Sequence, residues 1–372
     1  MGASALLLVC DFNAHGGTQT QVLELLAGID RGRFRPLLAT LNLDRDLAGR
    51  LAAIGIEVRN LGLRRAWRPG TLASIAGLAG QIRSERVRLV HGFLLQGNVA
   101  AALAARRAGV PYLTSVRNLE LWKGPLQSAA SRWAHRGAAA VTFNSSHVRD
   151  LVARRERIPL GRTRVIHNGL SADPPPPREP EAADAAWPAD AAPRLICAAS
   201  LFPKKGHRYL LEAFAIIAAV HPRAALLLAG QGPERPAIEA RAASLGIGGR
   251  VTLAGHRADV RRLIASADLL LLASIEEGMP NVLLEAMAAG VAQVSTRVGG
   301  AGEAMEEGVT GYLVPPRDPV MLAERALKIL SDEALRRRMG EDSRARFAER
   351  FGAARMAREH EALYEESLGG WS

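Results

Sequence analysis

The feature that most constrains the fold is an alternation of short apolar runs with amphipathic stretches, which begins at residue 3. Alternation of this kind predicts a parallel sheet covered by helices on both faces. In the first half the expected strands are 3–10, 36–41, 56–61, 87–91, 112–116, 139–143 and 164–167. The expected helices between them are 18–28, 71–83, 98–107, 126–136 and 145–154.

A proline-rich stretch then interrupts the pattern. Residues 171–193 contain seven prolines, four of them consecutive at 174–177, which predicts a stiff linker. After it the expected strands are 195–199, 225–229, 251–254, 269–273 and 292–295. The expected helices are 207–220, 233–245, 259–266, 281–289 and 319–331, followed by a helical tail over 332–368 with a break at 351–352.

The chain of 372 residues therefore predicts two doubly wound α/β domains, each Rossmann-like, facing one another across a cleft. We expect a first domain over 1–170, a linker over 171–193 and a second domain over 194–351. The last helix, about 352–368, is expected to pack back on the first domain. The cleft between two such domains is the expected active site.

Composition excludes several classes of protein. A hydrophobic fraction of 48% with 23% charged residues is ordinary for globular chains. No apolar run approaches the roughly 18 residues that span a bilayer, and residues 3–10 lack the basic leader of a secretory signal. Cys10 and Cys197 stand in separate apolar runs, which predicts buried thiols in a reducing compartment, and hence a cytoplasmic protein.

The net charge of +11 lies entirely in the first half. Residues 1–185 carry 25 Lys and Arg against 14 Asp and Glu, whereas residues 186–372 carry 23 of each. One reading is a solvated arginine-rich surface. A second is attraction to an anionic membrane at the inner face of the plasma membrane, to which Arg64, Arg65 and Arg68 around Trp67 would contribute. Nucleic acid is not expected as a partner, because no recognisable binding module is present.

The most informative segment is 276–290. An apolar strand ends at Ala273, a Gly-Met-Pro turn follows, and a helix is expected to begin near Asn281 with Pro280 in its first turn. The amides at a helix start suit a phosphate or a polyol oxygen. Glu277 on the loop and Glu285 one turn inside the helix offer two acceptors for hydroxyl groups of one extended ligand.

Seven residues separate Glu277 from Glu285, and this spacing resembles the glutamate-x7-glutamate motif of retaining glycosyltransferases of family 4, which have the GT-B fold. Further landmarks of that family occur in order along the chain. They are Gly16-Gly17 with Gln19, His91, Asn144-Ser145, His167-Asn168-Gly169, Lys204-Lys205-Gly206, Gly299-Gly300 with Glu303, and Gly311-Tyr312-Leu313-Val314 before Asp318.

The resemblance implies a nucleoside-diphosphate sugar held mainly by the second domain. Glu285 would bind the ribose hydroxyls, Glu277 the hydroxyls of the transferred sugar, and Lys205 the diphosphate. The complete expected donor site is Gly16, Gly17, Ser200, Lys205, Glu277, Gly278, Met279, Asn281, Val282, Leu283 and Glu285. The expected catalytic residues are His91, Glu277 and Lys205. For His91 the alternative is a polar residue that ends a buried strand.

One position departs from the family pattern. The usual Gly-Arg-Leu ahead of the lysine is replaced by Ala199-Ser200-Leu201. A serine hydroxyl carries no charge, so we expect weaker phosphate binding unless Lys204 or Arg297 substitutes.

Weaker signals surround these motifs. Residues that are candidates to line the cleft, or else to form turns, caps and surface loops, are Arg117, Asn144, Asn168, Gly230, His256 and Arg297. Base selection is expected near 255–257. Asp44-Arg45-Asp46 imitates a metal motif of another glycosyltransferase fold, but it lies in a helical surface stretch, and we expect neither a metal nor a cofactor.

The resemblance therefore implies a retaining, metal-independent glycosyltransferase. It would move a sugar to a hydroxyl of a glycan or lipid-linked acceptor, in the synthesis of bacterial cell-surface polysaccharide or glycolipid. The alternatives are a sugar-nucleotide epimerase or phosphorolytic enzyme on the same plan, and a non-catalytic nucleotide-sugar binder, which the serine at position 200 makes conceivable.

Overall fold

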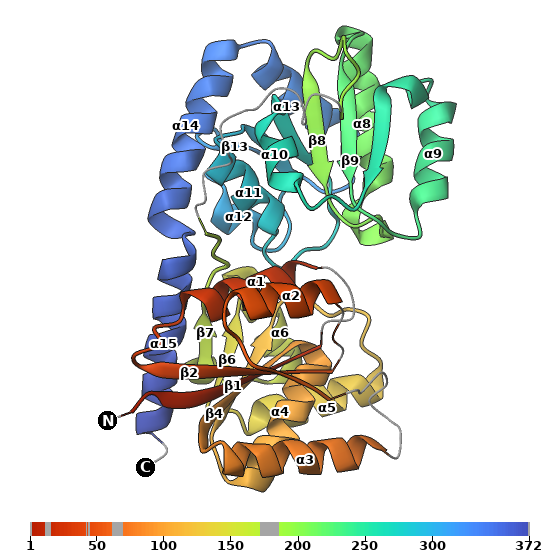
Figure 1. Ribbon diagram of the computed structural model, residues 1–372. Helices are drawn as coiled ribbons and strands as arrows, with labels where there is room; N and C mark the ends of the chain where they lie inside the picture. Colours follow the sequence, from red (N-terminus) through yellow and green to blue (C-terminus); the bar gives the residue numbers. More distant parts are fainter. Residues whose placement is uncertain are drawn as a thin grey trace. The chain divides into compact units, whose positions relative to one another are not determined.

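A computed structural model describes residues 2–11, 16–41, 43, 45–61, 70–171 and 186–370. The chain divides into two compact units, which we name unit 1 and unit 2 (Figure 1). Unit 1 comprises Met1–Ser171 with Ala353–Ser372, and unit 2 comprises Ala172–Gly352. Most of the proline-rich stretch, the arginines around Trp67, and Asp44 lie outside the described residues.

Unit 1 is built on a parallel sheet of seven strands in the order β3-β2-β1-β4-β5-β6-β7. The strands are β1 (Ser4–Cys10), β2 (Phe34–Thr40), β3 (Val58–Asn60), β4 (Val87–Phe93), β5 (Tyr112–Val116), β6 (Ala140–Phe143) and β7 (Thr163–Val165). Most of the strands are near-continuous buried runs, as parallel strands covered on both faces require.

Helices cover both faces of this sheet. They are α1 (Gly17–Gly28), α2 (Arg45–Ala53), α3 (Gly70–Ser84), α4 (Leu94–Ala108), α5 (Pro125–Arg136), α6 (Ser146–Glu156) and α15 (Ala353–Gly369), with a 3-10 turn at Leu160–Arg162. One core cluster joins the sheet to α3, α4, α5 and α6. A second joins the opposite face to α1, α2 and α15 (Figure 1).

The C-terminal helix α15 belongs to unit 1. Its buried residues Met356, Leu363 and Tyr364 lie in the same core cluster as Leu6 and Leu8 of β1. At its edge the Glu361 carboxylate accepts bonds from the Asp30 amide at 2.7 Å and from the Arg33 guanidinium at 3.0 Å. The expected break at 351–352 is observed between α14 and α15.

Unit 2 is built on a parallel sheet of six strands in the order β10-β9-β8-β11-β12-β13. The strands are β8 (Arg194–Ala198), β9 (Ala225–Ala229), β10 (Val251–Gly255), β11 (Leu269–Leu272), β12 (Gln293–Thr296) and β13 (Gly311–Val314). The helices are α8 (His207–Val220), α9 (Arg235–Ser244), α10 (Val260–Ala265), α11 (Asn281–Ala289), α12 (Ala301–Ala304), α13 (Pro319–Leu330) and α14 (Glu333–Arg350), with 3-10 turns at Pro203–Lys205 and Gly248–Arg250.

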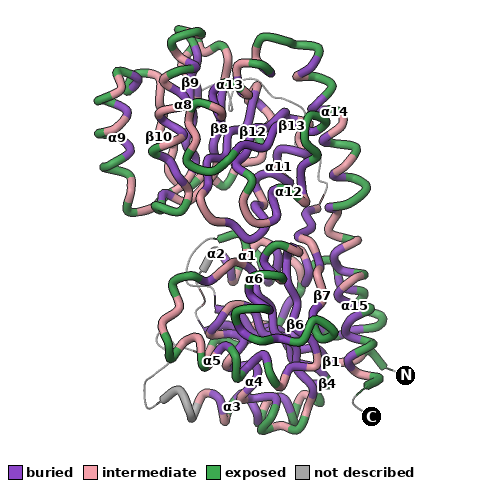
Figure 2. The backbone as a smooth tube through the Cα atoms, turned by 180° about the vertical axis from the view of Figure 1, so that it is seen from behind, coloured by how far each residue is buried: buried purple, intermediate pink, exposed green. Residues whose placement is uncertain are grey.

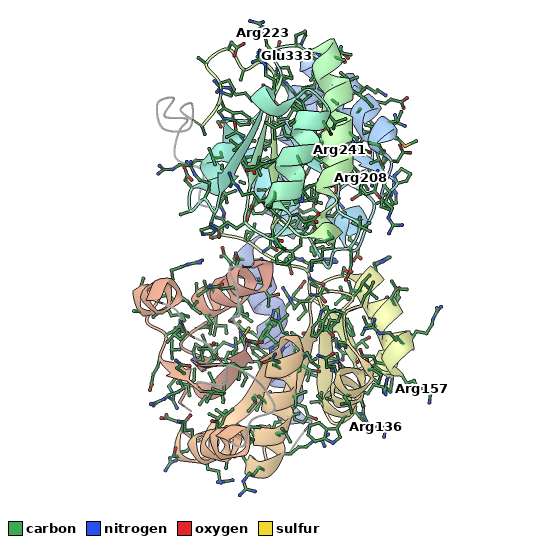
Figure 3. All side chains as sticks on the ribbon, turned by 90° about the vertical axis from the view of Figure 1, so that its right-hand side faces the viewer. Arg136, Arg157, Arg208, Arg223, Arg241 and Glu333 are labelled. Atoms are coloured by element: carbon green, nitrogen blue, oxygen red, sulfur yellow. The ribbon has the colours of Figure 1, made fainter. Side chains whose placement is uncertain are left out.

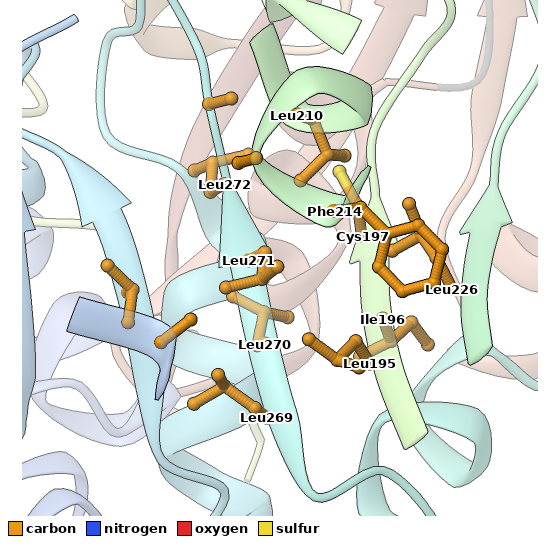
Figure 4. Packing of buried hydrophobic residues seen from close by; sticks show 14 of the residues in the cluster. Leu195, Ile196, Cys197, Leu210, Phe214, Leu226, Leu269, Leu270, Leu271 and Leu272 are labelled. Carbon is orange, nitrogen blue, oxygen red and sulfur yellow. The ribbon is translucent and has the colours of Figure 1, made fainter. Parts of the chain in front are cut away.

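The core of unit 2 lies between the central strands and the helices. Figure 4 shows the leucines of β11 and the apolar residues of β8 beside Leu210 and Phe214 of α8, all of which are buried. Burying one such side chain contributes roughly 1.5–3 kcal/mol. Figure 2 shows burial along the backbone: the strands are mostly buried, and the outer helices carry exposed turns. The predicted class of two doubly wound α/β units is confirmed.

Two local differences from the sequence-based prediction have physical reasons. Strand β13 was not expected, because its apolar run is only three residues long after a glycine. Gly311 is required there, since a Cβ would lie 2.1 Å from the Gln293 carbonyl oxygen. Helix α4 begins at Leu94 rather than at residue 98, because β4 passes directly into it through Leu94, whose φ is 64°. The buried thiols predicted for the two cysteines are confirmed.

The close approach of α4 to β1 depends on a glycine and gives a test. A Cβ at Gly97 would lie 2.6 Å from the Val9 carbonyl oxygen, so we expect Gly97→Ala to lower the free energy of unfolding by about 1–3 kcal/mol. Gly80 in α3 has no atom within 4 Å of its Cβ position. The matched variant Gly80→Ala should raise that free energy by about 0.5–1 kcal/mol, because alanine loses less backbone entropy than glycine when it folds into a helix. Urea denaturation measures both, and equal effects would contradict the proposed close packing.

Candidate functional site

The topology of unit 2 brings two loops together. Strand β8 lies between β9 and β11, so the chain winds outward in one direction through β9 and β10 and then in the other through β11. In open parallel sheets ligands bind beyond the carboxyl ends of the strands at such a switch point. The loops that leave β8 and β11 at this edge are 199–206 and 273–280, and they carry Lys205 and Glu277.

Lys205 and Glu277 form an ion pair at this edge. The Lys205 Nζ lies 2.5 Å from the Glu277 Oε1, and the Ser274 hydroxyl donates to the same oxygen at 2.7 Å. Glu277 is 8% exposed, so the carboxylate is held inside the loop rather than on the surface. A charge-assisted bond at this depth holds both side chains in place. If either partner were removed, the other charge would be left buried without a counter-charge.

The two loops are also joined through their backbones. The Ile275 amide donates to the Lys204 carbonyl at 2.7 Å. Gly206 has a φ of 65°, and a Cβ there would lie 2.1 Å from the Ala273 carbonyl oxygen, so glycine is required at the crossing. Next to them the Thr296 hydroxyl donates to the Ser274 carbonyl at 2.6 Å. These contacts therefore join the carboxyl ends of three neighbouring strands, β8, β11 and β12.

Helix α11 begins at Asn281, as predicted, but Pro280 is its N-cap in an extended conformation rather than a residue of its first turn. Gly278, Met279, Val282 and Leu283 are buried, whereas Asn281 and Glu285 are half-buried. The Leu283 amide already donates to the Pro280 carbonyl at 3.2 Å. The buried members of the expected donor set thus shape the loop and helix start, and the half-buried members remain accessible at its surface.

The remaining unit 2 candidates lie on the same edge of the sheet. Ser200 is half-buried on the loop after β8, and Gly230 packs against that loop so closely that a Cβ would lie 2.0 Å from the Ala199 carbonyl oxygen. His256 is exposed just after β10. Arg297 is exposed and pairs with Glu307 at 2.8 Å. Exposed pairs are weak, so this partner does not bar Arg297 from an anion.

In unit 1 the structure brings three predicted residues together at the ends of β5, β6 and β7. The Arg117 Nη2 donates to the Asn168 Oδ1 at 2.6 Å, and the Asn144 amide donates to the Arg117 carbonyl at 2.9 Å. Burial lowers the pKa of Arg117 to about 10, which leaves it charged at neutral pH. Gly16 and Gly17 are exposed at the start of α1.

His91 lies in the interior of unit 1. Its Nδ1 is 2.9 Å from the Tyr364 hydroxyl of α15, and its Nε2 is 3.0 Å from the Ser115 hydroxyl. The side chain is 2% exposed. Burial, with His360 and Arg117 nearby, holds the pKa of His91 well below its ordinary value. Both ring nitrogens are engaged, which agrees with the alternative of a polar residue that ends a buried strand, and the catalytic role of His91 stays a prediction.

Two residues near the ion pair were not singled out from the sequence. Ser274 positions the Glu277 carboxylate, and its place one residue after an apolar run was the only available signal. His207 begins α8 immediately after Gly206 and is 1% exposed. Burial and the charge of Lys205 lower its pKa to about 4. Within the described parts of the chain neither of its ring nitrogens has a hydrogen-bond partner.

Comparison with known proteins decides the family. The model described as "Glycosyl transferases group 1" matches residues 181–346, and "Glycosyl transferase 4-like domain" matches residues 16–169. The chain belongs to the family 4 glycosyltransferases. The two matches correspond to the two units, and the resemblance seen in the motifs is confirmed.

Relatives of this glycosyltransferase differ in how much they share with it. The N-acetyl-alpha-D-glucosaminyl L-malate synthase of Bacillus anthracis is 40% identical over 159 residues, which are 43% of this chain and 42% of that enzyme. The alpha-D-kanosaminyltransferase of Streptomyces kanamyceticus is 27% identical over 326 residues, covering 82% of this chain and 84% of the relative.

A solved structure establishes the architecture. The Anabaena protein HepE in complex with UDP superposes with a TM-score of 0.85 at 20% identity, covering 97% of this chain and 100% of HepE. The two units of the glycosyltransferase therefore have the GT-B fold. In the described helices no segment is both long and apolar enough to cross a membrane.

The ion pair predicts a coupled effect on stability. Lys205→Met leaves the Glu277 carboxylate buried without its cation, so we expect the free energy of unfolding of unit 2 to fall by about 2 kcal/mol or more. Lys204→Met, at an exposed neighbouring position, should change it little. Adding Glu277→Gln to Lys205→Met should recover part of the loss. Denaturant unfolding checks this, and a Lys205→Met variant as stable as Lys204→Met would show that the pair is not formed in solution.

Proposed function

We propose that this glycosyltransferase moves a sugar, with retention of anomeric configuration, from a nucleoside-diphosphate sugar to an acceptor hydroxyl. The observation that carries the proposal is the Lys205–Glu277 pair, held by Ser274 at the switch point of the sheet. A fixed cation and a fixed carboxylate side by side suit a ligand that offers phosphate oxygens next to sugar hydroxyls.

The donor would be shared among residues with different tasks. An ammonium group has three N–H donors, so the bond from Lys205 to Glu277 leaves two for the diphosphate. Glu277 would accept bonds from hydroxyls of the transferred sugar, and Glu285 from the ribose. HepE, a protein of the same fold, has been crystallised with UDP, which supports a nucleoside diphosphate as the ligand. Gly16 and Gly17 would let the start of α1 approach the same phosphates.

In the proposed reaction the acceptor oxygen bonds to the anomeric carbon as the bond from that carbon to the diphosphate breaks. The acceptor's proton passes to an oxygen of the departing diphosphate, on the same face of the sugar. Lys205 and backbone amides at the start of α11 would stabilise the negative charge that grows on the leaving group. We propose that the transfer needs neither a metal ion nor a cofactor.

The acceptor is proposed to be a glycan or a lipid-linked glycan at the inner face of the plasma membrane, in the synthesis of cell-surface polysaccharide or glycolipid. The support is the net positive charge, which is confined to residues 1–185. Basic residues near anionic head groups each contribute about 1 kcal/mol of attraction. Peripheral contact through unit 1 would bring the enzyme to an acceptor that stays in the membrane.

Adjacent glutamates allow a matched test of the reaction. Glu277→Gln removes the carboxylate that would contact the transferred sugar, so we expect turnover of donor with acceptor to fall about 100-fold or more. Glu276→Gln changes the neighbouring half-buried side chain and should keep turnover within a few-fold of the wild type. Circular dichroism and thermal unfolding confirm that both variants fold. Equal turnover in the two variants would refute the assignment of Glu277.

Ligand binding separates the proposed transferase from its alternatives. In a thermal-shift panel of nucleoside diphosphates and their sugars, a donor at a hundredfold its Kd should stabilise the protein by about 2.7 kcal/mol and raise the melting temperature. No shift with any nucleotide would contradict a donor site. Binding without consumption across a broad acceptor panel would indicate the non-catalytic binder, and product from donor or phosphate alone would indicate the epimerase or phosphorolytic enzyme.

A further inference from the structure

Large apolar side chains are exposed in one short region of unit 1. In the described part of the chain, eleven large hydrophobic residues are exposed, and four of them fall within 121–133. They are Leu121 at 64%, Trp122 at 60%, Leu126 at 78% and Trp133 at 38%. We name Leu121, Trp122, Leu126 and Trp133 the apolar patch. Exposed apolar side chains clustered on a protein surface indicate a contact with another protein or with a membrane.

The turn that carries Leu121 and Trp122 buries its charged side chains and exposes its apolar ones. Glu120 and Lys123 flank the tip at Leu121 and Trp122, and the Lys123 amide closes the turn on the Glu120 carbonyl at 3.2 Å. Both charged side chains point inward, with 3% and 2% of their surface exposed. The chain thus buries a carboxylate and an ammonium group while it presents a leucine and a tryptophan to solvent.

Buried charges hold the turn in place. The Lys123 Nζ lies 2.5 Å from the Glu120 Oε2 and 2.5 Å from the Glu156 Oε1 of α6. The Ser131 hydroxyl of α5 donates to the other Glu156 oxygen at 2.8 Å. Ion pairs buried to this degree are costly unless the geometry is fixed, so the network anchors the exposed tip to two helices.

Helix α5 extends the patch along the surface. Leu126, Ala129 and Trp133 are exposed at positions i, i+3 and i+7, which share one face of a helix. The helix spans twelve residues, or about 18 Å. The Arg106 guanidinium lies 4.2 Å from the centre of the Trp133 ring, which places a cation at that end of the apolar face.

The exposed charges of α5 are all basic. Residues 121–149 contain no Asp or Glu, and Arg132 and Arg136 of α5 are exposed. The neighbouring Glu120 is buried against Lys123, and Asp150 pairs with Arg149. Arg157, at the end of α6, is also exposed, and Figure 3 shows Arg136 and Arg157 reaching outward from this part of unit 1. Apolar anchors beside basic side chains on a helix match a bilayer surface with anionic head groups.

We propose that the apolar patch and the exposed arginines of α5 dock unit 1 on an anionic lipid bilayer, with α5 lying in the plane of the head groups. This deepens the membrane part of the proposed function and rests on it. The tip follows β5, on whose carboxyl end Arg117 contacts Asn168. Docking therefore places the lipid surface beside the edge of the sheet where parallel-sheet ligands bind, which suits a lipid-linked acceptor.

Vesicle sedimentation with the full chain tests the proposal. The protein should bind vesicles of phosphatidylglycerol and phosphatidylcholine, and bind vesicles of phosphatidylcholine alone at least tenfold less. The triple variant Leu121→Ser, Trp122→Ser, Leu126→Ser should lose at least tenfold in affinity for the anionic vesicles. Arg132→Gln with Arg136→Gln should weaken binding severalfold and flatten its salt dependence.

A matched control uses exposed apolar residues of unit 2. Val220→Ser with Val320→Ser, at positions 59% and 55% exposed, should leave vesicle binding unchanged. Thermal unfolding checks that all variants fold. Patch variants that bind anionic vesicles as tightly as the wild type would overturn the proposal, as would a wild-type dimer that the triple variant dissociates, which would identify a second copy as the occupant.

Donor turnover on a water-soluble acceptor keeps the two proposals separate. The triple variant should retain wild-type turnover in that assay, because the patch touches lipid and not the reacting groups. Loss of that turnover would overturn the docking role and assign the patch to the reaction. A wild-type protein that binds vesicles but transfers no sugar would refute the proposed function and leave the vesicle result standing.

Discussion

The bond between Lys205 and Glu277 is the interaction on which the organisation of unit 2 depends. It joins the loops after β8 and β11, two neighbouring strands between which the winding direction of the sheet reverses. A reversal opens a space beyond the strand ends, and the ion pair places opposite charges at its base. The same two groups also close the loops, so a fixed cation and a fixed carboxylate stand side by side at this edge of the sheet.

Glycines make that closure possible. The loops after β8, β9 and β11 approach one another so closely that a Cβ at Gly206 or Gly230 would overlap a carbonyl oxygen. Both residues also have positive φ values, which disfavour other side chains. These short contacts remove freedom from the backbone, so the ammonium and the carboxylate are oriented before any ligand arrives. A site prepared in this way loses less entropy on binding.

The sequence predicts regular elements well and tertiary surroundings poorly. Helix α11 and the break before α15 follow from local signals, namely Pro280 ahead of an amphipathic run and a glycine at position 352. The surroundings of His91 could not be predicted from the sequence, because they include Tyr364, 273 residues away. The outward display of Leu121 and Trp122 was equally invisible, since it depends on the contact of Lys123 with Glu156 in another helix. Periodicity carries no information on such pairings.

The return of α15 to unit 1 bears on how the protein is made. Unit 2 comes from one uninterrupted segment, whereas unit 1 needs residues from both ends of the chain. A ribosome therefore synthesises all of unit 2 before unit 1 has the Met356, Leu363 and Tyr364 side chains, which cover one face of its sheet together with α1 and α2. Until the final residues emerge, the part of that face that α15 covers is exposed to chaperones or to misassembly. Any fragment meant to represent unit 1 must carry the last helix, and the 2.9 Å bond from the Ala353 amide to the Leu170 carbonyl marks where the two pieces could be spliced.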